Sequence, residues 1–125
     1  MVITTIGLEV GNDSGLNIFD TVTHIGFGTG TTLPTIGNTA LVTEIGSRLA
    51  VTGTKDDAND SYDFEVRVPL GDYNSSTITE IGLFDASTSG NMFMRELIPD
   101  SGYAKTSNDE YVFTLRVKVV SVNGS

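Results

Sequence analysis

Two stretches of the sequence alternate apolar and polar side chains with a period of two, and this pattern most constrains the fold. The apolar positions of the first stretch are Phe64, Val66, Val68 and Leu70, and those of the second are Tyr111, Phe113, Leu115, Val117 and Val119. A period of two is typical of a β-strand with one face in the core. We therefore predict two long core strands, over residues 62–70 and 111–120.

Shorter strand patterns separated by turn residues occur through the rest of the chain. Residues 77–84 and 91–98 flank "DASTSGN", which favours a hairpin with a loop longer than two residues. "GNDSG" at 11–15 indicates another turn. Many short strands at regular spacing predict an all-β fold, an antiparallel β-sandwich that is jelly-roll-like or Ig-like. The length of 125 residues predicts one domain over 1–125.

One segment, "NTALVTEIGSRLA" at 38–50, has a helical pattern. Asn38 suits an N-cap, and Leu41, Ile45 and Leu49 recur every four residues on one face. Gly46 would weaken a helix by about 1 kcal/mol. We therefore predict a short helix near residues 39–45, followed by a strand over 48–54.

The composition excludes several function classes. The net charge is −9, so a nucleic-acid backbone would be repelled and we expect no nucleic-acid partner. The acidic balance suits a high-salt habitat as well as an ordinary acidic protein. There is no cysteine, so neither disulfides nor thiol chemistry are available. We also find no signal peptide and no apolar run of about 20 residues, and expect a chain made in the host cytoplasm without membrane contact.

Catalytic motifs are missing. His24 is the only histidine, and no Gly-x-Ser-x-Gly sequence provides a nucleophile for it. "GFGTGTT" at 26–32 is glycine-rich but lacks the lysine of a phosphate-binding loop. Glu44 and Glu80 could serve glycoside hydrolysis only if they lie close together. The alternative is structural: Glu44 pairs with Arg48 four residues on, and Glu80 pairs with Arg95 on the adjacent strand. We expect no enzyme and no cofactor.

An acidic segment provides the only candidate metal ligands. Its oxygen-bearing side chains are those of Asp56, Asp57, Asn59 and Asp60. Calcium prefers such ligands, but an EF-hand loop beginning at Asp57 would need glycine where Tyr62 stands and glutamate where Val68 stands. We therefore interpret the segment as a solvated acidic loop rather than a cation site.

Two sequence blocks together resemble the N-terminal module of tail-collar and tail-fibre proteins of tailed viruses. The first block, residues 26–51, carries Gly28, Gly30, Pro34, Leu41, Glu44 and Arg48. The second block, residues 78–97, carries Glu80, Gly82 and Phe84 and then the strand that contains Arg95. The tetrapeptide "TEIG" occurs in both blocks, at 43–46 and 79–82. We interpret these residues as a structural motif of the scaffold.

The resemblance implies a virion structural protein of a bacteriophage or archaeal tailed virus. Fibre proteins usually continue into a long repetitive shaft, whereas this sequence shows no such repeats after its last predicted strand. We therefore expect a compact component of a tail, baseplate, head-to-tail region or capsid vertex, including a turret or decoration protein. Its partners would be further copies of itself and other virion proteins, and its location the virion. The alternative is a carbohydrate- or receptor-binding module that holds a host-surface glycan on exposed aromatic rings, for which Tyr62, Tyr73 and Tyr103 are the candidates. A small hydrolase using Glu44, Glu80 or His24 is a third hypothesis.

Overall fold

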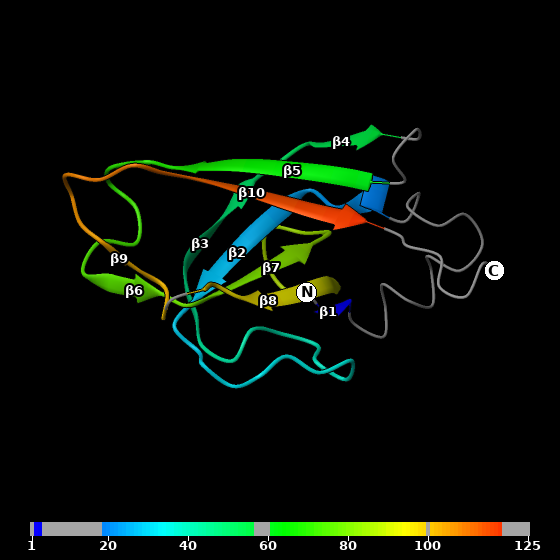
Figure 1. The fold of residues 1–125 in the computed structure, drawn as a ribbon, viewed down its shortest axis with the longest axis horizontal. Helices are drawn as coiled ribbons and strands as arrows, with labels where there is room; N and C mark the ends of the chain where they lie inside the picture. The colour runs from blue at the N-terminus through cyan, green and yellow to red at the C-terminus, as the bar shows by residue number, and fades with distance from the viewer. Residues whose placement is uncertain (1, 4–18, 57–60, 100, 119–125) are drawn as a thin grey trace.

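The computed structural model describes residues 2–3, 19–56, 61–99 and 101–118, and this part of the chain is built of antiparallel β-strands (Figure 1). The larger sheet has the order β1-β8-β7-β2-β3, with bounds Val2–Ile3, Met92–Leu97, Glu80–Phe84, His24–Gly28 and Glu44–Ala50. The smaller sheet has the order β10-β5-β4, with bounds Tyr111–Lys118, Ser61–Val68 and Gly53–Asp56. A third, two-stranded sheet pairs β6 (Ser76–Ile78) with β9 (Tyr103–Lys105). The all-β, antiparallel class predicted from the sequence is confirmed.

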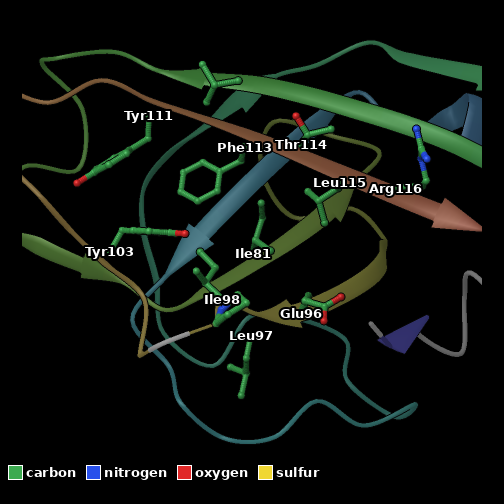
Figure 2. Close-up of a pocket in the computed structure, with 12 residues that line it drawn as sticks. Ile81, Glu96, Leu97, Ile98, Tyr103, Tyr111, Phe113, Thr114, Leu115 and Arg116 are labelled. Atoms are coloured by element: carbon green, nitrogen blue, oxygen red, sulfur yellow. The ribbon is translucent and has the colours of Figure 1, made fainter.

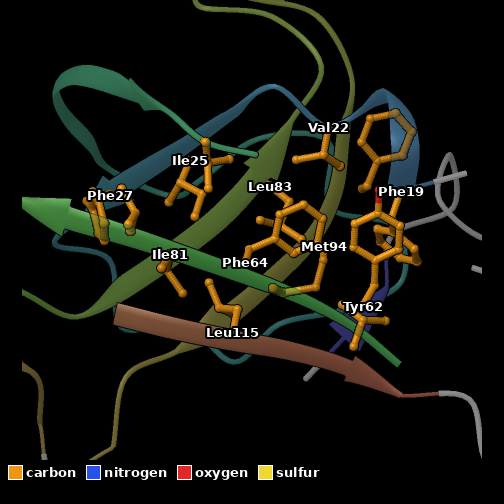
Figure 3. Close-up of a cluster of buried hydrophobic side chains, with 14 of the residues drawn as sticks. Phe19, Val22, Ile25, Phe27, Tyr62, Phe64, Ile81, Leu83, Met94 and Leu115 are labelled. Carbon is orange, nitrogen blue, oxygen red and sulfur yellow. The ribbon is translucent and has the colours of Figure 1, made fainter. Parts of the chain in front are cut away.

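The core lies between the two larger sheets, as Figure 3 shows for part of it. The inward side chains of the larger sheet include Ile25, Phe27, Ile81, Leu83 and Met94, and those of the smaller sheet include Phe64, Val66, Val68, Leu115 and Val117. These residues form a single buried cluster. The period-two pattern therefore identified the core-facing side of both long strands correctly.

The pattern failed at the end of the first long strand. Leu70 is 49% exposed rather than buried. β5 ends at Val68, and the next residue, Pro69, has no N–H to continue the ladder. The chain turns there, and the amide of Asp72 donates to the carbonyl of Pro69. In the other long strand, β10 is described to Lys118, so Val119 lies outside the described residues.

The predicted helix near residues 39–45 is wrong. Residues 39–43 form a bent, non-helical segment, and β3 begins at Glu44. The Asn38 side chain accepts a hydrogen bond from the amide of Thr35, within a turn that precedes the predicted helix. The amides of Val42 and Thr43 donate to the Glu80 carboxylate rather than to helical carbonyls. Tertiary hydrogen bonds therefore outweigh a weak local helix preference.

Two other sequence predictions change in detail or fall outside the described part. The strand expected over 48–54 is divided between β3 and β4, with a break at residues 51–52. The hairpin around "DASTSGN" is confirmed as β7 paired with β8. Asp85 holds its loop, because its carboxylate accepts hydrogen bonds from the amide of Asn91 at 2.8 Å and from the side chain of Asn91 at 3.1 Å. The "GNDSG" turn lies outside the described residues.

Candidate functional site

A buried ion pair between β7 and β8 anchors the long connection from β2 to β3. Glu80 and Arg95 are both 0% exposed, and Arg95 Nε donates to Glu80 Oε1 at 2.8 Å. The same carboxylate accepts the amide hydrogens of Gly30, Val42 and Thr43 at 2.8–2.9 Å. Glu80 therefore joins the two ends of the 29–43 segment to the β7–β8 hairpin. The pairing of Glu80 with Arg95 predicted from the sequence is present.

Two glycines of the first sequence block give the Glu80 carboxylate its space. A Cβ atom built at Gly28 or at Gly30 would collide with Glu80 Oε2. At Gly28 it would also collide with the backbone carbonyl of Thr43, which cannot move as a flexible side chain could. Two of the glycines of "GFGTGTT" are therefore needed because a carboxylate lies against the backbone there.

A second polar cluster lies beside the first, around Arg48. Its guanidinium donates to the Glu44 carboxylate at 2.8 and 3.2 Å and, through Nη1, to the carbonyls of Ala86 and Ser89. It also lies 3.5 Å from the centre of the Phe84 ring, close enough for a cation–π contact. Arg48 therefore fixes the β7–β8 loop against β3.

The Glu44–Arg48 pair was predicted for a helix but forms on a strand. Between Ile25 and Phe27 of β2 the partner shifts from Leu49 to Ile45, so β3 has extra residues at this point. Gly46 lies in this irregular stretch with φ +60°, a conformation that L side chains rarely adopt. The irregularity, rather than a helical turn, brings Glu44 and Arg48 together.

The structural motif predicted from the resemblance comes together almost entirely. Gly28, Gly30, Glu80 and Arg95 belong to the buried ion-pair site, and Glu44, Arg48 and Phe84 to the cluster beside it. Leu41 packs with Phe84 and Met92 in a small apolar cluster, and Gly82 lies against these three side chains. Pro34 lies half-buried in the 29–43 segment.

The environment of Glu80 makes the fold sensitive to acid. Burial raises the pKa of its carboxyl, but hydrogen bonds from Thr43, Arg95, Val42 and Gly30 stabilise the carboxylate more and hold the pKa below its usual value. A lowered folded-state pKa contributes stability above the unfolded-state pKa of about 4.3, and this contribution is lost as the pH falls through the folded-state value.

We therefore expect the stability gap between the wild-type protein and a Glu80→Gln variant to be largest above about pH 5 and to shrink towards pH 3. Urea denaturation at a series of pH values measures this gap. Asp63→Asn is the control, because Asp63 has a lowered pKa from its hydrogen bonds to Arg116 but is partly exposed to solvent. Its gap should be small throughout. A Glu80→Gln gap that stays constant from about pH 6 to about pH 3 would contradict this account.

The described residues that were considered for catalysis make hydrogen bonds within the fold. Both oxygens of Glu80 are engaged in internal hydrogen bonds, and Glu44 is bound to Arg48. His24 begins β2 half-buried, with Nδ1 2.8 Å from the hydroxyl of Thr23. Asp56 ends β4, whereas Asp57, Asn59 and Asp60 lie outside the described residues. Among the residues that are described, no group of three or more His, Asp or Glu side chains could hold a metal ion.

The three tyrosines considered for glycan binding do not form a common platform. Tyr62 is buried, and burial together with its hydrogen bond to Asp20 raises its pKa to about 12. Tyr73 packs edge-on against Phe27, with its hydroxyl bonded to the carbonyl of Ser47. Of the three, only Tyr103 is exposed, with 45% of the residue's surface accessible to solvent.

An apolar groove of about 500 Å³ lies along β10, between this strand and the β8–β9 region (Figure 2). Tyr103, Tyr111 and Phe113 gather towards one end, with ring centres 5.5–6.2 Å apart. Glu96 and Arg116 lie towards the other end. The sequence pattern placed Tyr111 and Phe113 on the core side of a strand, but it did not indicate that Tyr103, on β9, would extend this row to the surface.

Lys105 is a second feature that the sequence pattern did not indicate. Its side chain is 1% exposed, and Nζ donates to the Leu70 carbonyl, the Asn74 side chain and the Thr106 carbonyl at 2.8–3.2 Å. These acceptors satisfy all three hydrogens of the ammonium group. Lys105 therefore ties the end of β9 to the loop between β5 and β6. A single lysine among turn residues gives no sequence signal for such a role.

No helix in the described part of the chain is long and apolar enough to cross a membrane. No protein-family model matches the sequence, and neither the curated proteins nor the solved structures include a match to the chain.

Proposed function

We propose that the chain is a structural protein of a tailed-virus particle, built into a symmetric homo-oligomer of a tail, baseplate, head-to-tail region or capsid vertex. The observation that carries this proposal is the Glu80 site. It unites the glycines of the first tail-collar-like sequence block with the Glu80–Arg95 pair of the second. The residues that carry the resemblance thus depend on one another physically, as a shared scaffold requires.

The use of the polar side chains supports an assembly role over catalysis. Glu80, Arg95, Arg48 and Lys105 direct their charged groups to internal partners. The surface instead offers the groove along β10 and the apolar side chains of Tyr103 and Val112, which are 45% and 49% exposed. Exposed apolar patches of this kind are typical of protein–protein contact sites.

We expect oligomer formation to strengthen as the salt concentration rises. Subunits with a net charge of −9 repel one another in dilute buffer. Salt shortens the screening length from about 10 Å at 0.1 M to about 3 Å at 1 M, which removes most of this repulsion. Static light scattering across this salt series should show a rising average molar mass. A protein that stays monomeric at every salt and protein concentration would contradict the proposed function.

A glycan-binding module is the second candidate, and the exposed Tyr103 ring beside Tyr111 favours it. Aromatic rings with one open face are suited to contact sugars, since they combine an apolar surface with a polar edge. A titration of the protein with host-surface glycans distinguishes the two candidate functions. The receptor-binding candidate would be favoured if the wild-type protein stays monomeric and binds host-surface glycans, and if the Tyr103→Ala variant no longer binds them.

A further inference from the structure

We propose that β10 pairs antiparallel with β10 of a second copy, around a twofold axis that lies between the two strands, midway between Phe113 and Phe113 of the second copy. The three-stranded sheets of the two copies would then join into one continuous sheet, and the second copy would fill the groove. This inference rests on the proposed homo-oligomer and names the surface and the register that build it.

The β10 strand lies at an open edge of its sheet. It pairs with β5 on one side through eight consecutive residue pairs, from Tyr111 with Val68 to Lys118 with Ser61. Among the described residues, no strand pairs with its other side. An edge of this length presents backbone N–H and C=O groups that can template another strand.

An apolar surface lies beside this edge. Val112 is 49% exposed, and Tyr111 and Phe113 remain half-buried at the groove. Tyr103 and Ile98 form the opposite wall (Figure 2). A strand added to β10 would place its own inward side chains against this wall, so the same side chains from two copies would cover one another.

Charge complementarity along β10 favours a second copy as the occupant, and the charged and apolar pairs together favour one register. A twofold axis perpendicular to the sheet keeps core-side residues opposite core-side residues and outer residues opposite outer ones. With the axis at Phe113, Tyr111 lies opposite Leu115 of the second copy, and Glu110 lies opposite Arg116 of the second copy. The symmetry repeats each pair, so two opposite-charge pairs form.

Neighbouring registers are less complementary. An axis at Thr114 sets Glu110 opposite Lys118 of the second copy, but it also sets the apolar Val112 opposite Arg116. An axis at Val112 sets Arg116 opposite Asn108. In the single chain, Glu110 bonds Arg67 and Arg116 bonds Asp63, and all four side chains lie at the surface or partly exposed. Because each carboxylate can accept several hydrogen bonds, these pairs can extend across the axis without breaking.

Two charge reversals test the register directly. Glu110→Arg sets two arginines opposite each other across the axis, and Arg116→Glu sets two glutamates opposite each other. Each variant alone should therefore dimerise at least about tenfold more weakly than the wild type. In an equimolar mixture of the two variants, the heterodimer has an opposite-charge pair at both contacts, one between the two reversed residues and one between the two unchanged residues. It should therefore form more readily than either variant forms a homodimer. Native mass spectrometry resolves the species, and circular dichroism shows that each variant keeps its fold.

Arg67→Gln is the matched control. It removes the intrachain partner of Glu110 but leaves the contact across the axis, so its dimer affinity should remain within about twofold of the wild type. If the two reversed variants dimerise like the wild type, or if their mixture yields no heterodimer while the wild type still oligomerises, this pairing is wrong and the proposed assembly uses another surface. A wild type that is monomeric under all conditions would instead overturn the proposed function itself.

Discussion

Replacing Arg95 by methionine should lower the free energy of unfolding by about 3–5 kcal/mol, because it leaves the Glu80 carboxylate buried without its counter-charge. Both side chains are 0% exposed, so water cannot replace the lost partner. The loss should also loosen the 29–43 segment, since Gly30, Val42 and Thr43 all donate to this carboxylate. Urea denaturation followed by circular dichroism measures the change.

The exposed pair of Arg67 with Glu110 is a matched control for this effect. Arg67→Met removes the same guanidinium from a surface ion pair and should leave the urea midpoint nearly unchanged. A double variant, Glu80→Gln with Arg95→Met, removes the buried charge and should cost less than the sum of the two single changes. Equal effects of Arg95→Met and Arg67→Met would contradict the role assigned to the buried pair.

The second large effect concerns the core strand β10, where Leu115→Asp should prevent folding. Leu115 is 7% exposed and belongs to the cluster between the sheets. An aspartate there would bury a charge without a partner, and the cost of doing so is comparable to the whole stability of a small domain. The expected result is a protein without a cooperative thermal transition.

Val112→Asp provides the control on the same strand. Val112 is 49% exposed and lies opposite Arg67 on β5, so a carboxylate there stays in solvent next to a cation. We expect its unfolding free energy to stay within about 0.5 kcal/mol of the wild type. A folded Leu115→Asp protein with an unchanged melting temperature would show that the core has been assigned to the wrong face of β10.

The sequence predicted the parts of the fold that depend on local patterns. The alternation in β5 and β10 gave the core side of each strand, because only one register of a strand can bury its apolar set. The pairing of Glu80 with Arg95 followed from their position on two strands of one hairpin. What the pattern could not give was the set of backbone amides around Glu80, which come from residues 30, 42 and 43, far earlier in the chain.

The helix predicted near residues 39–45 shows why such contacts matter. Leu41, Ile45 and Leu49 have helical spacing, yet Leu41 packs on Phe84 and Met92 in a cluster separate from the main core, and the other two lie in β3. The local preference was weak, with Gly46 in its middle. Long-range hydrogen bonds to Glu80 decided the conformation, and nothing in the local sequence encodes them.

The groove was missed for a related reason. Tyr103 is separated from Tyr111 by a turn, and its ring joins those of Tyr111 and Phe113 only because β9 pairs with β6 beside the end of β10. Lys105, buried nearby, holds this arrangement through acceptors from three different residues. Surfaces built from several distant segments leave no periodic signal in a sequence.

The most direct test of the proposed function is a cryo-electron microscopy map of the virus particle that encodes the chain. The proposal predicts density for this β-fold in several symmetry-related copies on the tail, baseplate, head-to-tail region or capsid vertex, with the β10 edge at a contact between copies. Particles whose map and protein composition contain no copy of the chain would contradict the proposal.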